Sequence, residues 1–285
     1  MTKISDYQTP NFPNWCPGCG NLNIWGSFKK AAVQESWDNS NSVMVAGIGC
    51  HGHIVNFIKM SSFEGLHGRA LPVATGVKMA NNRLNVFVFT GDGDCFGEGG
   101  NHFIHACRRN HDLAVLIHDN ALYALTTGQT SPLSDHGYKS KSTPKGNLDE
   151  PFNPLVLAIA SGATFVARAY SGDIPKLTEL IIEANNHKGF SVIDILQPCV
   201  TFNKVCTHGF YQENVYYLEK DYDPANKSKA LDRAAEFGPN KIPLGVFYKA
   251  DRPSYEEQIP QIKSRPLIEI PVNRIGATEL FKKYT

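Results

Sequence analysis

Two oxygen-bearing side chains, Asp92 and Asn120, stand close behind two apolar runs. The tetrapeptide GDGD at 91–94 follows NVFVFT, and Asn120 follows LAVLI by three residues. Carboxylate and amide oxygens suit a magnesium-type cation, whose other positions can take phosphate oxygens, a backbone carbonyl and water. The glycines permit a tight turn, and the positive end of the following helix is a place for phosphate. We therefore expect a metal that clamps a diphosphate here; the competing interpretation is a glycine-rich strand-to-helix turn without ligand.

Cysteines form a second group of candidate ligands. Cys16 and Cys19 make a C-x2-C pair, whose thiolates can reach one metal or one cluster. Cys50 and Cys199 each follow an apolar run, so both are expected at the sheet edge that carries Asp92. Cys206 is a rival fourth ligand. Four thiolates hold either structural zinc or a [4Fe–4S] cluster, and their spacing alone leaves both open.

The elements that position these residues alternate along the chain. Helices are expected at 21–36, 71–81, 99–109, 153–161 and 175–187, and strands at 42–50, 85–89, 113–119, 164–168 and 191–196. Short strands, apolar on both faces and separated by helices, are typical of a parallel sheet covered on both sides. The predicted fold class is α/β: a doubly wound, mostly parallel sheet with helices on both faces. Ligands of such sheets bind at the carboxyl ends of strands.

The predicted domain organisation is a cofactor domain followed by an arm. Residues 1–224 are assigned to the domain that binds the diphosphate and the cluster, with a loop at 120–152. The polar, proline-containing residues 225–285 are assigned to a C-terminal extended arm that packs on the domain or on a partner subunit.

Bulk composition excludes several classes of function. With 285 residues, 42% of them hydrophobic, the chain can bury a proper core. A net charge of +1 without a basic run gives no case for nucleic acid. There is no apolar stretch of membrane-spanning length and no apolar core of a signal peptide near the start, so a cytoplasmic location is expected. In that compartment, seven cysteines favour metal binding or reactivity over disulfides.

The segment from Gly91 to Asn120 resembles the signature of thiamine-diphosphate enzymes. That signature usually ends in two asparagines, whereas this chain has Asp119-Asn120. The resemblance implies that the side chains of Asp92 and Asn120 and the backbone carbonyl of Leu122 bind Mg²⁺. A cluster beside such a cofactor can take electrons from it and zinc cannot, so the cluster is favoured over zinc.

An ordered set of motifs over most of the chain resembles the beta subunit of 2-oxoacid:ferredoxin oxidoreductases. The motifs are WCPGCGN (15–21), GIGCHGH (47–53), LHGRALPVATGVKMAN (66–81), GDGDCFGEGGNHFIHACRRN (91–110), LYALTTGQTSP (122–132), LQPCVTFNK (196–204) and LGVFYKADRPSYEE (244–257). The resemblance implies thiamine diphosphate, Mg²⁺ and one [4Fe–4S] cluster held by Cys16, Cys19, Cys50 and Cys199. Its QPCVTFN motif favours Cys199 over Cys206.

The resemblance also implies a reaction and a set of site residues. The reaction is oxidative decarboxylation of a 2-oxoacid, such as pyruvate or 2-oxoglutarate, with coenzyme A, and electrons pass through the cluster to ferredoxin. The implied cofactor-binding residues are Ile48, Gly49, Cys50, His51, His67, Gly91, Asp92, Gly93, Asp94, Asn120, Leu122 and Leu125.

Three residues are assigned to the reaction itself. Leu125 would pack against the thiazolium, and Thr127 would line the substrate side; an ordinary apolar loop anchor is the alternative for Leu125. His53 is hypothesised to hydrogen-bond a substrate carboxylate when protonated, and so to help select the 2-oxoacid. For His67, which the resemblance places near the cofactor, the alternative is a helix-capping histidine.

The sequence accounts for only one half of a thiamine site. The resemblance places the glutamate that meets the aminopyrimidine, and much of the coenzyme A contact, on an alpha subunit. The expected assembly is a heterodimer or a dimer of heterodimers, with ferredoxin as electron partner. Two rival functions remain: a non-oxidative thiamine-diphosphate-dependent 2-oxoacid decarboxylase subunit, and a zinc-stabilised nucleotide-binding module.

Overall fold

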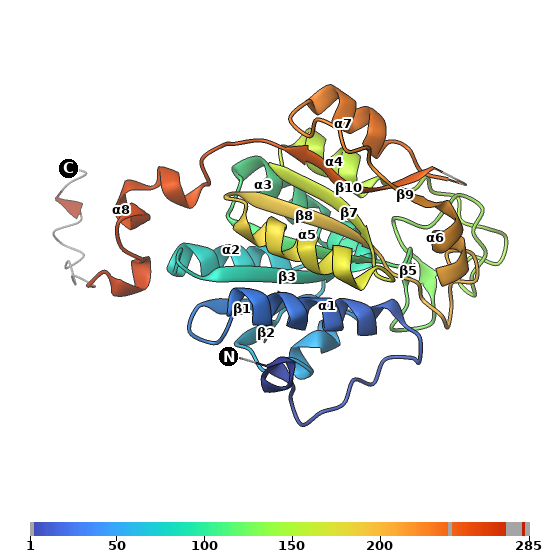
Figure 1. Ribbon diagram of the computed structural model, residues 1–285, viewed down its shortest axis with the longest axis horizontal. Helices are drawn as coiled ribbons and strands as arrows, with labels where there is room; N and C mark the ends of the chain where they lie inside the picture. Colours follow the sequence, from blue (N-terminus) through green and yellow to red (C-terminus); the bar gives the residue numbers. More distant parts are fainter. Residues whose placement is uncertain (1–2, 239–240, 272–280, 283–285) are drawn as a thin grey trace.

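An eight-stranded, mostly parallel sheet forms the centre of the computed structural model, which describes residues 3–238, 241–271 and 281–282 (Figure 1). The α-helices are α1 (Gly20–Glu35), α2 (Ala70–Ala80), α3 (Gly100–Arg109), α4 (Pro154–Ser161), α5 (Ile174–Asn186), α6 (His208–Asn214), α7 (Lys227–Ala234) and α8 (Pro260–Lys263). The strands are β1 (Ser42–Ala46), β2 (Ser62–Glu64), β3 (Asn85–Gly91), β4 (Leu113–Asp119), β5 (Leu122–Tyr123), β6 (Gln129–Thr130), β7 (Phe165–Tyr170), β8 (Phe190–Leu196), β9 (Val215–Tyr217) and β10 (Ile242–Lys249). Shorter helical turns are η1 (Ile4–Tyr7), η2 (Gly52–Asn56), the π-helical η3 (Gly93–Glu98), η4 (Glu256–Gln258) and η5 (Leu267–Glu269).

The strand order of the sheet is β2-β1-β3-β4-β8-β7-β10-β9. The six strands from β2 to β7 in this order run parallel to one another, and β10 pairs antiparallel with β7. The carboxyl ends of β1, β3, β4 and β8 therefore meet at one edge of the sheet. The predicted α/β class with a mostly parallel sheet is confirmed.

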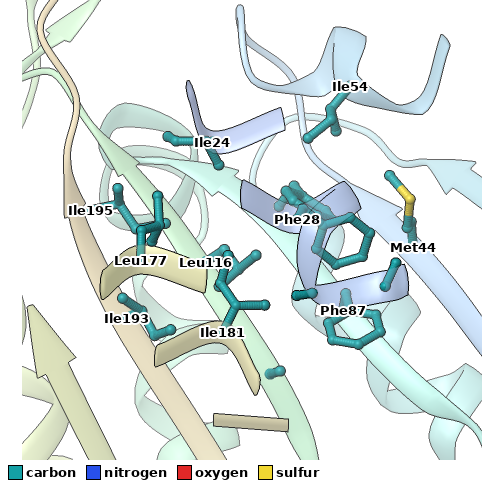
Figure 2. Packing of buried hydrophobic residues seen from close by; sticks show 14 of the residues in the cluster. Ile24, Phe28, Met44, Ile54, Phe87, Leu116, Leu177, Ile181, Ile193 and Ile195 are labelled. Carbon is teal, nitrogen blue, oxygen red and sulfur yellow. The ribbon is translucent and has the colours of Figure 1, made fainter. Parts of the chain in front are cut away.

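Side chains of the central strands alternate between the two faces of the sheet. On one face Phe87, Leu116 and Ile193 pack in a cluster with side chains of α1 and α5 (Figure 2). On the other face Val88 and Val115 pack in a cluster with side chains of α2, α3, α4 and α7. Both faces are thus covered by helices, which explains why apolar residues occupy both faces of the central strands.

Local signals set the ends of the helices. The Asn153 side chain accepts hydrogen bonds from the amides of Leu155 and Val156 at the start of α4, and Pro154 is its first residue. Gly162 ends α4 with a φ of 96°. The predicted helices and strands agree with these bounds to within two residues, except that β1 ends at Ala46 because the chain turns from Gly47 onward. No helix of the described residues has the length and apolar character needed to cross a bilayer.

The sheet extends beyond residue 224, the predicted end of the cofactor domain. Strand β10 lies within the predicted arm, yet it pairs with β7 and β9, because its apolar residues complete the sheet beyond β7. Pro243 and Gly245 weaken its strand signal in the sequence. After β10 the chain leaves the sheet, and Glu256 reaches back to His111 with Oε1 2.7 Å from Nδ1. The residues at 272–280 and 283–285 of the predicted arm lie outside the described residues.

Candidate functional site

A cavity of about 480 Å³ opens at the carboxyl ends of β1, β3 and β4. All the residues predicted to bind the cofactor line it: Ile48, Gly49, Cys50, His51, His67, Gly91, Asp92, Gly93, Asp94, Asn120, Leu122 and Leu125. Tyr123 and Gln129 of the β5–β6 hairpin contribute to the wall as well. Four segments far apart in the sequence therefore converge on one crevice, three of them directly behind strands of the parallel sheet.

Asp94 holds these segments together. Its Oδ1 accepts hydrogen bonds from the amides of Ile48 at 3.1 Å and Gly68 at 2.7 Å, and its Oδ2 accepts one from the Thr90 hydroxyl at 2.6 Å. Burial by itself would raise the pKa of Asp94, but the neighbouring His51 and the bonds from Gly68 and Thr90 lower it to about 2. Asp94 is therefore a charged anchor beneath the cavity.

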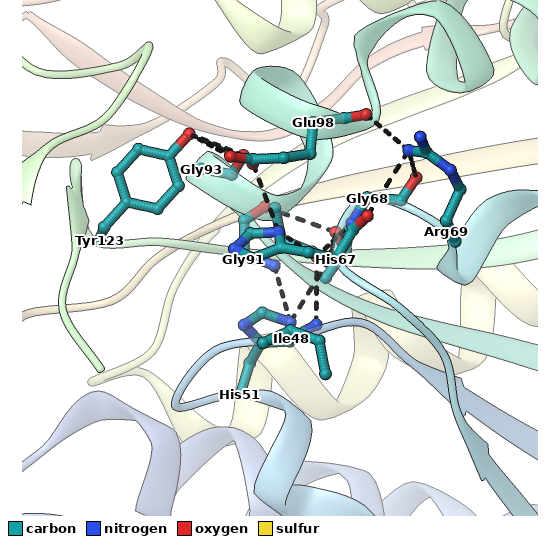
Figure 3. Close-up of polar contacts among 11 residues, drawn as sticks. Ile48, His51, His67, Gly68, Arg69, Gly91, Gly93, Glu98 and Tyr123 are labelled. Atoms are coloured by element: carbon teal, nitrogen blue, oxygen red, sulfur yellow. Dashed lines mark hydrogen bonds and ion pairs between the residues drawn. The ribbon is translucent and has the colours of Figure 1, made fainter. Parts of the chain in front are cut away.

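Two histidines, His51 and His67, lie next to Asp94, and Figure 3 labels both of them. His51 accepts a hydrogen bond from the Gly91 amide on Nε2 at 3.1 Å, which ties the turn after β1 to the end of β3. His67 Nδ1 lies 3.0 Å from Asp94 Oδ1 and 3.3 Å from Glu98 Oε2. The residue at the cap position of α2 is Arg69, so His67 is not the cap of this helix.

Two glycines leave space that any side chain would fill. A Cβ at Gly47 would lie 1.8 Å from Asp94 Oδ2, and a Cβ at Gly93 would lie 2.5 Å from the Tyr123 ring. Glycine at position 47 therefore allows the turn after β1 to pack directly against Asp94. Glycine at position 93 allows the Tyr123 ring of the hairpin to pack directly on the backbone after Asp92.

Asp92 and Asn120 lie together at the bottom of the cavity. The backbone amide of Asn120 donates to Asp92 Oδ1 at 3.5 Å, and the Ser131 hydroxyl donates to Asp92 Oδ2. Burial raises the pKa of Asp92 to about 7, although the bonds from Ser131 and Asn120 favour its charged form. The Asn120 Oδ1 atom accepts from the Leu122 amide at 3.1 Å, which holds Leu122 close by. A divalent cation would supply the counter-charge that buried Asp92 lacks, so these residues fit a Mg²⁺ site.

A second cavity, of about 310 Å³, adjoins the first. It is lined by all four predicted cluster ligands, Cys16, Cys19, Cys50 and Cys199. Burial, and to a smaller extent the neighbouring thiols of Cys19, Cys199 and Cys16, raise the pKa of Cys50 to about 12. The four sulfurs therefore lie near enough to influence one another.

A zinc ion and an iron–sulfur cluster place different demands on four thiols. Within the described part of the chain, no group of three or more His, Cys, Asp or Glu side chains is arranged to hold a single metal ion. A tetrahedral zinc ion draws four thiolates onto one centre, whereas in a [4Fe–4S] cluster each thiolate binds a separate iron. Either centre would draw on the four thiols that line this cavity.

The loop that carries the C-x2-C pair is fixed by Trp15. Its indole Nε1 donates to the Cys50 carbonyl at 2.6 Å, and its ring meets Phe57 edge-on with centroids 4.9 Å apart. The Cys19 amide donates to the Cys16 carbonyl at 2.9 Å, which closes the turn between the two thiols. Packing of a single aromatic side chain thus brings the N-terminal loop onto the turn after β1.

The two cavities share a wall. Cys50, Asn120, Ala124, Leu125 and Thr126 line both of them. A group in the first cavity and a group in the second would therefore be separated by only a layer of side chains. This is an arrangement suited to electron transfer between two cofactors.

Two predicted reaction residues take positions that the sequence did not indicate. His53 lines the cysteine cavity and is absent from the lining of the first cavity among the described residues. Thr127 is exposed and lines neither of these two cavities; its amide donates to Gln129 Oε1 at 3.2 Å. Its neighbour Thr126 occupies the shared wall instead.

Cys206 belongs to a different cavity. It lines a pocket of about 190 Å³ on the other side of the β4 end, together with Asp119, Arg168 and Tyr211. Asp119 and Asn120 thus face opposite sides of the chain, because successive side chains of an extended segment alternate. The residue that replaces the usual first asparagine of the signature therefore does not face the predicted metal site.

Several functional contacts gave no signal in the sequence. Ser131, directly after β6, donates to Asp92. Gln197 and Thr201 donate to Cys19 Sγ at 3.2 Å and Cys16 Sγ at 3.0 Å. Gln197 and Thr201 flank Cys199 in the motif LQPCVTFNK, and that position was the one available hint.

Two family models match the chain. The model described as thiamine pyrophosphate enzyme, C-terminal TPP binding domain, matches residues 47–195. The model for the C-terminal part of the pyruvate ferredoxin oxidoreductase beta subunit matches residues 199–264. The first range contains the turns after β1, β3 and β4, and the second begins at Cys199.

Curated relatives and a solved structure are similar over most or all of the chain. A 2-oxoacid:ferredoxin oxidoreductase subunit beta from Sulfolobus sp is 45% identical over 265 residues, covering 88% of this chain and 87% of the relative. A 2-oxoglutarate synthase subunit KorB from Archaeoglobus fulgidus is 44% identical, covering 71% of this chain and 76% of the relative. The solved structure is the 2-oxoglutarate:ferredoxin oxidoreductase from Magnetococcus marinus with 2-oxoglutarate, coenzyme A and succinyl-CoA bound. It aligns with a TM-score of 0.91 at 33% identity and covers 100% of this chain and 96% of that chain.

Proposed function

Because this chain belongs to the beta subunits of the 2-oxoacid:ferredoxin oxidoreductases, we propose that it carries thiamine diphosphate, Mg²⁺ and a [4Fe–4S] cluster in the oxidative decarboxylation of a 2-oxoacid with coenzyme A. One observation carries the proposal: the diphosphate cavity and the four-cysteine cavity share Cys50, Asn120 and Leu125 in a common wall. When bound, the cluster would supply the one-electron acceptor that connects the reaction to ferredoxin.

Each part of the first cavity has a role in holding the cofactor. Asp92, the Asn120 side chain and the Leu122 carbonyl bind Mg²⁺, and the backbone around Gly93 accommodates the diphosphate. When bound, thiamine diphosphate supplies the electron sink that decarboxylation needs. Asp94 and His51 hold the turns after β1 and β3 in fixed positions relative to each other, so that the ligands of the metal stay in place.

The wall between the cavities orients the two cofactors relative to each other. Leu125 is 47% exposed in this chain, so its apolar side chain is available to pack against a thiazolium ring. Cys16, Cys19, Cys50 and Cys199 bind the cluster behind this wall. We assign Thr127 to the substrate side of the active site, on the loop that also carries Leu125. We assign His53, which lines the cysteine cavity, to selection of the 2-oxoacid.

The complete enzyme requires a second polypeptide. We propose an alpha subunit that covers the open first cavity, supplies the glutamate to the aminopyrimidine and makes much of the coenzyme A contact. Exposed apolar side chains near this cavity, including Leu66 at 78% exposure, are consistent with such a cover. The assembly is a heterodimer or a dimer of heterodimers, and the substrate is a 2-oxoacid of the class that includes 2-oxoglutarate and pyruvate.

An anaerobic experiment tests the proposal. The chain is co-purified with its partner, and iron, sulfide and thiamine diphosphate are quantified. The complex is then assayed with pyruvate, 2-oxoglutarate and branched-chain 2-oxoacids, coenzyme A and a low-potential acceptor. We expect a brown complex that forms acyl-CoA and reduces the acceptor, and an isolated chain that binds iron–sulfur but turns over no 2-oxoacid.

Other results would favour the rival functions. Zinc without iron, and no retained thiamine diphosphate, would replace the proposal with a zinc-stabilised nucleotide-binding module. Carbon dioxide release without reduction of the acceptor, from a complex that lacks iron, would point to a non-oxidative decarboxylase. Robust turnover by the purified chain alone would contradict the need for a partner.

A further inference from the structure

Gln197 touches both ligand sets with one side chain. This residue directly follows β8 and is 2% exposed. Its Nε2 donates to Cys19 Sγ at 3.2 Å, and its Oε1 accepts from Asn120 Nδ2 at 3.1 Å. The two ends of one amide therefore contact a predicted cluster ligand and a predicted Mg²⁺ ligand.

The surrounding backbone holds Gln197 in this position. Its own amide donates to the Asp119 carbonyl at 2.7 Å, and the Gly20 amide donates to the Pro198 carbonyl at 3.3 Å. A Cβ at Gly20 would lie 2.7 Å from Gln197 Cγ and 3.3 Å from Gln197 Cα. Glycine after Cys19 is thus what lets the cysteine loop approach Gln197 closely.

At the Mg²⁺ side, Gln197 determines which atom of Asn120 is available. An asparagine amide has one acceptor oxygen and one donor nitrogen, and a cation binds only the oxygen. Gln197 Oε1 engages Asn120 Nδ2, while the Leu122 amide donates to Asn120 Oδ1. Both contacts select the same orientation of the amide, with the oxygen on the Leu122 side, where the metal site was assigned.

At the cluster side, the same residue donates a hydrogen bond to sulfur. Hydrogen bonds to the sulfurs of an iron–sulfur cluster stabilise its more negative, reduced state and so raise its reduction potential. Thr201 makes the corresponding contact to Cys16 Sγ through its hydroxyl at 3.0 Å. Gln197 differs from Thr201 because its other end is committed to Asn120.

We infer that Gln197 is a positioning residue that couples the two cofactor sites: it orients Asn120 for Mg²⁺–thiamine diphosphate and raises the potential of the cluster through Cys19. This inference rests on the proposed function, because it assigns both ligand sets their cofactors. It gives one side chain two measurable effects, which a merely structural role would not produce together.

The test compares three variants of the complex of the chain with its partner. Gln197→Leu removes both polar ends at similar volume, and Gln197→Asn keeps an amide that is too short to span the two partners. Thr201→Val is the matched control, since it removes a donor to a cluster-ligating sulfur without touching the Asn120 contact. The cluster potential is measured by spectroelectrochemistry, and the Mg²⁺-dependent affinity for thiamine diphosphate by titration calorimetry of the apo-complex.

Both Gln197 variants are expected to weaken thiamine diphosphate binding about tenfold, as for other outer-shell partners of a metal. Both are expected to lower the reduction potential of the cluster by ~28 mV, which corresponds to about a threefold change in the one-electron reduction equilibrium. Thr201→Val is expected to lower the potential and leave the affinity unchanged. A wild-type potential or affinity in both Gln197 variants, or an equal loss of affinity in Thr201→Val, overturns the inference. A wild-type complex without iron or thiamine diphosphate refutes the proposed function instead.

Discussion

Replacing Asp94 with alanine tests whether one buried carboxylate holds the cofactor cavity together. The change removes the common acceptor of the Ile48 amide, the Gly68 amide and the Thr90 hydroxyl. Asp94 is 2% exposed, so water cannot easily replace the lost partner. The turns after β1 and before α2 would lose their connection to β3.

The size of the effect follows from these three contacts. A hydrogen bond to a charged group contributes about 1.5–3 kcal/mol, so independent losses would total roughly 4.5–9 kcal/mol. The contacts share one acceptor and are not additive, and single substitutions rarely exceed about 4–5 kcal/mol. We therefore expect Asp94→Ala to destabilise the chain by about 4 kcal/mol, or to lower the melting temperature by roughly 8 °C.

The conservative variant Asp94→Asn is the matched control. Its carbonyl oxygen can still accept from the Ile48 and Gly68 amides, and its amide group faces the Thr90 hydroxyl, so about half the loss is expected. Both variants are measured by anaerobic thermal unfolding of the complex, with thiamine diphosphate affinity as a second readout. If Asp94→Ala melts with the wild type, or if both variants lose equal stability, the anchor role of Asp94 is refuted.

Four shorter predictions concern other residues. Cys199→Ser is expected to abolish the four-iron spectrum while Cys206→Ser retains it, since Cys206 lines a different cavity; equal iron content in the two variants would contradict this. Asp92→Asn should weaken Mg²⁺-dependent binding of thiamine diphosphate about 100-fold or more, because a ligand of the metal itself is changed; calorimetry that finds wild-type affinity would reject the site. His53→Ala should alter the relative rates with pyruvate, 2-oxoglutarate and branched-chain 2-oxoacids, and unchanged ratios would end its assignment to substrate selection. Burial lowers the pKa of His187, so its neutral form stabilises the fold at pH above about 6.5, and this contribution is lost as the pH falls through the lowered pKa; a His187→Gln variant with the same acid slope of melting temperature as the wild type would disprove it.

Residue chemistry and local pattern predicted most of the fold and much of the site. Apolar runs indicated the central strands, and glycines with aspartate at 91–94 marked the turn that carries Asp92. The cofactor-binding residues and the four cluster cysteines that the family resemblance implied line the two adjoining cavities. The local pattern placed Asp92, Asn120, Cys50 and Cys199 because parallel strands bring their carboxyl ends to one edge, so a residue close behind a strand has a predictable location.

Long-range packing controls the features that the pattern missed. Pro243 and Gly245 masked β10, which joins the sheet only because β7 offers it an open edge. Whether His53 and Thr127 line the first cavity, the cysteine cavity or neither depends on the conformation of the turns that carry them. Pattern and spacing do not encode those conformations.

The order of residue types along the chain was enough to identify the available chemistry: which side chains can bind a hard cation, which can bind iron, and which strands carry them. The contacts between distant residues became visible only in the folded chain. Gln197 meets Cys19 across 178 positions of sequence, and Asp92 meets Ser131 across 39. A hydrogen bond depends on the positions of two atoms to within a few tenths of an ångström, and those positions are set by the packing of the whole sheet and its helices.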